Sequence, residues 1–181
     1  MTATRPVPWF IKAAAPFIQR LTAQYISHHR KRLIGAAELI SSDRQAELEG
    51  FFPRAVLQET RIVRARLPEP KFYPLVRMLR VEGLLEMSSI GAITLIDVIA
   101  YPKQMDRSTL FHEMVHVAQY RVLGLRRFAD LYVRGFFNGG GYEGIPLEQQ
   151  AYELETRFSR NPKEKFSVEG DVVRRHEAGL L

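Results

Sequence analysis

Apolar positions recur at helical spacing near the start of the chain. Between residues 9 and 33 they lie three and four positions apart, which predicts an amphipathic helix. The apolar stripe consists of Phe17, Ile18, Leu21, Tyr25 and Ile26. We expect Pro16 to lie at a break or in a first turn, and residues 1–8 to form an extended lead, because prolines there remove backbone donors.

The pattern then predicts a short helix, two strands and a loop. Residues 41–50 indicate a helix with a serine cap and a terminal Gly50. Alternation within residues 54–66 favours a strand around residues 56–63, and three prolines in residues 68–74 predict a loop or short turns. Residues 90–101 form the most apolar run and end before a proline. They predict a single strand, buried or at the wall of a cleft.

A longer helix is predicted after this strand. Asp106 or Ser108 is the expected cap, and Gly124 is the expected end. Residues 125–137 predict a further helix with one apolar face.

Asn138 and the three glycines that follow it mark the clearest break in the chain. The loop either lets Tyr142 swing toward a bound substrate or is only a flexible connection. Pro146 predicts the start of another helix. The tail from residue 159 is polar and contains at most one further short element, and we expect His176 to lie on the surface.

Together these elements predict an α+β fold, a mainly helical single domain with a small antiparallel sheet beside the helix that contains residues 111–120. A chain of 181 residues with 46% hydrophobic content suits one core and no second domain. We divide it into an N-terminal amphipathic helical segment (1–35), a main domain (36–160) and a C-terminal tail (161–181).

Composition narrows the chemistry. The absence of cysteine excludes disulfides and thiolate metal ligands. The net charge of +6 favours an anionic partner, but the charge is spread along the chain without a nucleic-acid-binding motif, so nucleic acid is not expected. Residues 9–33 either pack on the domain, which we favour, or contact a membrane surface through their apolar and basic residues. With no membrane-spanning run and no secretory signal, we expect a cytoplasmic location, peripheral to the membrane if residues 9–33 contact its surface.

Residues 111–120 carry the candidate chemistry. Their sequence, FHEMVHVAQY, contains His-Glu-x-x-His. In a helix His112 and His116 point at one spot, which is the spacing of two zinc ligands. Glu113 is then placed to activate a water on the metal rather than to bind it. Apolar neighbours strengthen this interpretation, because polar side chains in such surroundings need partners.

A catalytic zinc site requires a third protein ligand. The metzincin pattern is excluded, because Val122 occupies the position of its third histidine. We favour Glu148, which begins a helix that can return beside the first one. The alternatives are Asp130, Glu143, Glu153 and Glu155.

Three separated segments resemble the small bacterial zincin-like metallopeptidases of the gluzincin type. They read VIAYP before the helix, LFHEMVHVAQY within it and IPLEQQAY after the glycine loop. The resemblance covers about residues 90–158 and implies a zincin-like fold with zinc bound by His112, His116 and Glu148. It also implies that Glu113 is the catalytic base, and it supplies no substrate.

We therefore predict a Zn²⁺-dependent hydrolase, a metallopeptidase acting on a peptide or related amide bond. Tyr142, Tyr120 and Tyr152 are candidate donors to the oxyanion, and we assign Tyr142. The alternative is a catalytically silent zincin-fold binding or delivery module that associates with a membrane surface or a partner protein. A third possibility is a structural protein whose histidine pair is incidental.

Overall fold

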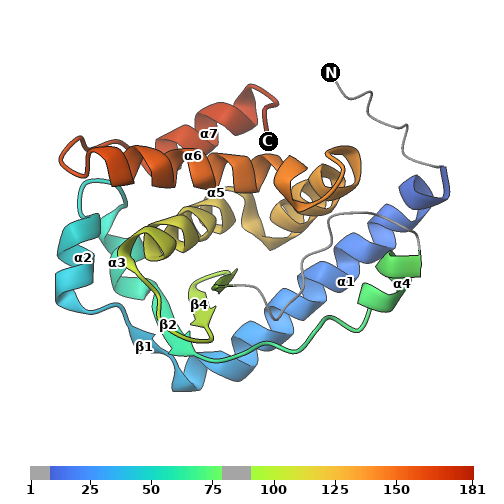
Figure 1. The fold of residues 1–181 in the computed structure, drawn as a ribbon, viewed down its shortest axis with the longest axis horizontal. Helices are drawn as coiled ribbons and strands as arrows, with labels where there is room; N and C mark the ends of the chain where they lie inside the picture. The colour runs from blue at the N-terminus through green and yellow to red at the C-terminus, as the bar shows by residue number, and fades with distance from the viewer. Residues whose placement is uncertain (1–8, 79–90) are drawn as a thin grey trace.

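The long helix α5 (Arg107–Asn138) runs through the middle of the computed structural model, which describes residues 9–78 and 91–181. Figure 1 shows α6 and α7 on one side of α5, and α1 and the sheet on the other. The other described elements are α1 (Trp9–Leu33), η1 (Ile34–Ala36), β1 (Glu38–Leu39), α2 (Ser42–Leu48), α3 (Arg54–Glu59), β2 (Arg61–Arg64), α4 (Tyr73–Met78), β3 (Ile93–Leu95), β4 (Val98–Tyr101), η2 (Tyr142–Gly144), α6 (Pro146–Arg160) and α7 (Val168–Glu177). The mainly helical α+β fold is confirmed.

Helix α1 is formed as predicted, and it continues through Pro16 rather than breaking there. Ile18 and Ile26 of the predicted stripe are buried, whereas Phe17 is 57% exposed. The Gln19 amide donates a 2.7 Å hydrogen bond to Asp130 on α5, which ties the two helices together. Within the described residues, no helix combines the length and apolar character that crossing a membrane requires. The predicted lead of residues 1–8 lies outside the described residues, and membrane contact through residues 9–33 stays a prediction.

The small sheet is mixed rather than purely antiparallel. Its strand order is β1-β2-β4-β3, in which β1–β2 and β3–β4 are antiparallel and β2–β4 is parallel. A parallel pair needs a long crossover between its strands, and the chain between β2 and β4 provides it. Strand β3 lies at the side of the sheet that packs against α5.

Two strand predictions were wrong in detail. The strand expected around residues 56–63 begins only at Arg61, because residues 54–59 form α3 with both Val56 and Leu57 buried. The single strand expected over residues 90–101 is a hairpin of β3 and β4, in which Ile96 turns the chain with φ 67°. Residue 90 lies outside the described residues. The proline-rich loop leads into α4, which the pattern did not indicate.

Helix α5 is two helical segments in one element. Gly124 has φ 72° and ψ 159°, which is non-helical and suits a residue without a side chain. The predicted helix end at this glycine is therefore a kink. It separates the motif segment of α5, residues 107–123, from the second segment, residues 125–138. Asp106 caps the start, accepting a 2.7 Å hydrogen bond from the Thr109 backbone.

An aromatic cluster packs the motif segment of α5 against α6. Phe111 stacks on Phe158 of α6 with ring centroids 4.2 Å apart, and Phe51 meets both rings edge-on. All three side chains are at most 1% exposed. Burial of each large side chain contributes about 1.5–3 kcal/mol, so this cluster fixes α5 against α6.

Candidate metal centre

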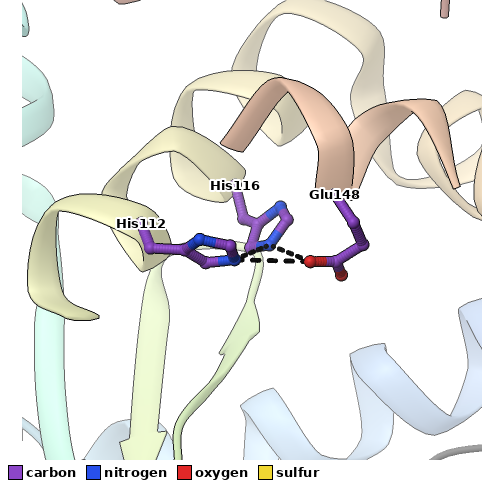
Figure 2. A group of neighbouring side chains, drawn as sticks. All are labelled: His112, His116 and Glu148. Carbon is purple, nitrogen blue, oxygen red and sulfur yellow. Dashed lines mark hydrogen bonds and ion pairs between the residues drawn. The ribbon is translucent and has the colours of Figure 1, made fainter. Parts of the chain in front are cut away.

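Two histidines of α5 and one glutamate of α6 converge on a single point (Figure 2). The Nε2 atoms of His112 and His116 are 3.2 Å apart. Glu148 Oε2 lies 3.3 Å from His112 Nε2 and 3.4 Å from His116 Nε2. Each of these residues is at most 6% exposed. Within the described residues, these three side chains, which we call the cluster, form a group that could hold a metal ion.

The outer nitrogen of His112 is held by a second glutamate of α6. His112 Nδ1 lies 3.1 Å from Glu155 Oε2. An ionised carboxylate only accepts hydrogen bonds, so Nδ1 carries the hydrogen in the neutral ring and the Nε2 lone pair faces the cluster. Glu155 follows Glu148 by two turns, and α6 therefore supplies both carboxylates that position His112.

The outer nitrogen of His116 is held by a chain of buried amides. His116 Nδ1 lies 2.8 Å from Gln119 Oε1, and the Gln119 amide nitrogen donates to Leu147 O and to Gln150 Oε1, both at 2.9 Å. Gln150 in turn donates a 2.7 Å bond to Asp171 on α7. Because Leu147 O can only accept, the Gln119 oxygen must face the histidine, and the His116 Nε2 lone pair points at the cluster.

Charge is strongly coupled within the cluster. Burial lowers the pKa of His112, but hydrogen bonds with Glu148 and Glu155 outweigh it and raise that pKa to about 9. Burial lowers the pKa of His116, but the charge of Glu148, a hydrogen bond with Glu148 and the charge of Glu113 together outweigh it and raise that pKa. Burial raises the pKa of Glu148, but the two histidines outweigh it and hold that pKa far below its usual range. Glu148 is therefore ionised, and the cluster attracts positive charge.

Glu113 lies beside the three-residue group rather than in it. Its Oε2 accepts a 2.6 Å hydrogen bond from the Thr94 hydroxyl of β3, and the residue is 6% exposed. Burial raises the pKa of this carboxyl, partly offset by His116 and by the Thr94 hydrogen bond. A buried carboxyl with a raised pKa, adjacent to a candidate metal group, is placed to exchange protons with groups bound at that site.

Among the three candidate tyrosines, Tyr142 bonds directly to the cluster. Its hydroxyl donates a 2.6 Å hydrogen bond to Glu148 Oε2. Burial, followed by the charge of Glu148, raises the pKa of Tyr142 far above its usual value, so the phenol stays neutral. Tyr120 is buried and donates to Thr94 O at 3.4 Å, whereas Tyr152 is half exposed with its ring 4.5 Å from that of His112.

The loop of residues 139–144 positions Tyr142, and the α6 helix that follows it positions Glu148. Gly139 and Gly144 pack backbone against backbone, and a side chain at either position would clash with the other residue. Tyr142 lies between them in η2, and Glu148 lies in the first turn of α6. The loop is thus closely packed at its two ends. The sequence suggests either a loop that lets Tyr142 swing toward a substrate or a flexible connection, and neither interpretation includes this packing.

The other carboxylates considered from the sequence lie elsewhere. Asp130 forms ion pairs with Arg127 and Arg134, and Glu153 pairs with Arg175. Glu143 is exposed. Of the alternatives to Glu148, Glu155 comes closest, and it contacts the outer nitrogen of His112 rather than the shared point.

Several site residues were not identified from the sequence. Thr94, Gln119, Gln150 and Asp171 had no assigned role. A signal was present for Thr94, because a hydroxyl inside an apolar buried run requires a partner. The roles of Gln119 and Gln150 were less evident from the sequence, because a glutamine on a helix does not show which distant residue it will contact.

A cavity of about 170 Å³ adjoins the cluster, and Glu113, His116 and Glu148 are among its lining residues. Most of its remaining wall is apolar or aromatic, and it comes from α1, α4, β3 and the second segment of α5. The apolar wall includes Ile18, Ile26, Val76, Phe128, Phe136 and Phe137.

Comparison with known proteins gives no assignment. No protein-family model matches the chain, and neither a curated protein nor a solved structure matches it. The geometry of the three-residue group is therefore the main indication of function.

Proposed function

We propose that this protein is a zinc-dependent hydrolase that cleaves a peptide or related amide bond. The observation that carries the proposal is the triangle of donor atoms from His112, His116 and Glu148, with sides of 3.2, 3.3 and 3.4 Å. Tetrahedral ligation at 2.0–2.1 Å places neighbouring donors about 3.3 Å apart, so the triangle fits zinc and leaves a fourth position for substrate or water.

The ligand types agree with this choice of metal. Two imidazoles and one carboxylate form a donor set used by catalytic zinc sites, and each histidine is oriented through its outer nitrogen. When bound, zinc would polarise the substrate carbonyl and lower the pKa of a water molecule. A resemblance to gluzincin-type metallopeptidases over residues 90–158 points to the same chemistry.

Glu113 is the proposed base. Its carboxyl, held by Thr94, takes the proton of the attacking water and later passes it to the leaving amine. Tyr142 is the proposed hydrogen-bond donor to the oxyanion, because its neutral hydroxyl already reaches the edge of the metal group. Strand β3 lies beside α5, where an extended peptide could pair with it.

The first prediction concerns Glu113→Gln. This change should lower hydrolysis by about 100- to 10,000-fold while zinc stays bound, because it removes the base and leaves the ligands unchanged. Hydrolysis is measured on a peptide library by mass spectrometry, and zinc by elemental analysis of the purified protein. Glu38→Gln, at an exposed residue of β1, is the matched control and should retain full activity.

Two outcomes would contradict parts of the proposal. Full activity of Glu113→Gln removes Glu113 from the mechanism, and unchanged zinc content in His116→Ala removes that histidine from the ligands. A wild-type protein that binds stoichiometric zinc yet cleaves no peptide would favour the catalytically silent binding module.

A further inference from the structure

The residues that line the cavity beside the cluster determine the polarity and charge that an occupant would meet. None of its described lining residues is lysine or arginine. Several of its hydroxyl groups are already engaged within the protein: Tyr25 donates to Pro68 O at 2.7 Å, and Thr22 donates to Ile18 O at 2.9 Å. Tyr120 donates to Thr94 O, whereas Tyr142 is the proposed donor to the oxyanion and lies at the edge of the metal group. Apart from the carboxylates of Glu113 and Glu148 and the His116 imidazole, the described wall is therefore mostly apolar and contains no lysine or arginine.

The size of the cavity limits what it can hold. An apolar cavity of about 150 Å³ accommodates a benzene molecule. The volume here, about 170 Å³, suits one group of similar size. A leucine or phenylalanine side chain fits this limit, whereas a long acyl chain exceeds it.

Helix α1 contributes one wall of the cavity through Ile18, Thr22, Tyr25 and Ile26. Two polar contacts fix this wall in place. Gln19 bonds Asp130 on α5, and the Arg30 guanidinium forms hydrogen bonds of 2.5 and 2.6 Å with the Asp97 carboxylate in the β3–β4 turn. The helix lies outside residues 90–158, so this wall belongs to a part of the chain without the metallopeptidase resemblance.

We propose that the cavity binds one bulky apolar side chain of a peptide substrate, of leucine or phenylalanine size, next to the bond that is cleaved, and that α1 determines this specificity. The inference rests on the proposed hydrolase function. It follows from the shared lining: Glu113, His116 and Glu148 face the same space as the apolar wall, so a side chain seated there holds its neighbouring amide at the cluster.

A peptide series that differs at one position beside the cleaved bond tests the preference. Peptides with Leu or Phe should exceed the Ala peptide in kcat/KM by about 10- to 100-fold, since that is the effect of burying such a side chain. Asp and Lys peptides should be poor substrates. Equal kcat/KM for the Ala, Leu and Phe peptides, or preference for a charged residue, overturns the inference.

Variants of α1 test the role of the helix. Thr22→Phe should fill the cavity and lower kcat/KM for the Phe peptide at least 10-fold, with a smaller effect on the Ala peptide. Ile18→Ala should enlarge the cavity and shift the preference toward Trp. Gln24→Phe places the same new side chain on the exposed face of α1 and should change neither value. Unchanged preference in both cavity variants overturns the role of α1.

A binding measurement separates failure of this inference from failure of the hydrolase proposal. Ligand-observed NMR with N-acetylphenylalanine amide is applied to the zinc-loaded wild type, Thr22→Phe and Gln24→Phe. If no peptide is cleaved, the hydrolase proposal fails, and this measurement decides on the cavity. Binding that is lost in Thr22→Phe and kept in Gln24→Phe supports the cavity. No binding to the wild type, or equal binding by both variants, overturns it.

Discussion

At the scale of single residues, the two histidines are oriented by different chemistry. His112 is held through Nδ1 by the Glu155 carboxylate, whose side chain is 23% exposed, and His116 by the fully buried Gln119 amide. The Gln119 oxygen is fixed because its amide nitrogen already donates twice. The Gln119 amide is neutral and is held by two hydrogen bonds of its own. It therefore orients the His116 ring without adding another buried charge to the site.

Gln119→Leu should therefore lower zinc affinity by about 10- to 100-fold, the usual effect of losing the partner of a ligating histidine. Affinity is measured by competition with a chelator at fixed pH. Gln58→Leu, at an exposed position of α3, is the control. If Gln119→Leu lowers only the melting temperature of the zinc-free protein and leaves affinity unchanged, Gln119 is structural rather than a positioning residue.

At the scale of elements, the capped start of α5 determines where the motif helix begins. Asp106 accepts the Thr109 N–H at 2.7 Å, and its oxygen also accepts the Ser108 hydroxyl at 3.2 Å. The hydrogen bond from Thr109 lowers the pKa of Asp106. The cap therefore stabilises the helix only when Asp106 is ionised. It acts at the N-terminus of α5, just before the two histidines.

Asp106→Ala should lower the free energy of unfolding at pH 7 by about 1 kcal/mol. Because the folded pKa is depressed, the contribution is complete above the unfolded pKa of about 3.9 and is lost as pH falls through the folded value. Chemical denaturation between pH 7 and pH 3 checks this. A wild-type minus variant difference that stays constant down to pH 3 would contradict an ionised cap.

Sequence patterns predicted the elements whose signals are local. The helices at residues 9–33 and 146–160 follow from apolar spacing and Pro146, and the meeting of His112, His116 and Glu148 follows from the motif and the return of the chain. The role of Glu155 was not separable from that of Glu148, because the two residues share one helix face.

The hairpin of β3 and β4 could not be predicted, because no glycine or asparagine marks its turn. Ile96 adopts φ 67°, which is unfavourable for a branched side chain, and the turn is held by partners distant in sequence. Arg30 binds the Asp97 carboxylate, and the Arg61 N–H donates to Asp97 O at 2.9 Å. Helix α3 was missed for another reason: six residues are too few to show helical periodicity.

At the scale of the whole molecule, α5 joins two regions of the core. Residues of its motif segment share one core region with α2, α3 and α6, and Phe128, Leu131 and Val133 of its second segment share another with α1, Leu95 and Val98. Strand β3 also contacts the motif segment through Thr94 and Glu113. The candidate metal centre lies on the motif segment and α6, and the apolar cavity beside it is lined largely by residues of the second region. Loss of a bound ion should therefore affect the stability of the entire fold.

Removal of zinc by a chelator should lower the melting temperature. An ion present at 1,000 times its dissociation constant stabilises the folded state by about 4 kcal/mol, which corresponds to about 8–16 °C for a chain of this size. Differential scanning calorimetry with and without added zinc measures the shift. His116→Ala should show no response to zinc, and an equal shift in this variant would place the stabilising ion elsewhere.

The arrangement of the candidate metal centre also bears on how α5 and α6 are held together. The chain has no cysteine, so no disulfide restrains it, yet His112 and Glu148 are separated by 36 positions and belong to different helices. A covalent tie of that span would remove chain entropy worth about 4 kcal/mol from the unfolded state. A shared zinc ion would act as a reversible cross-link between α5 and α6, and the concentration of free metal would determine how often that link is closed.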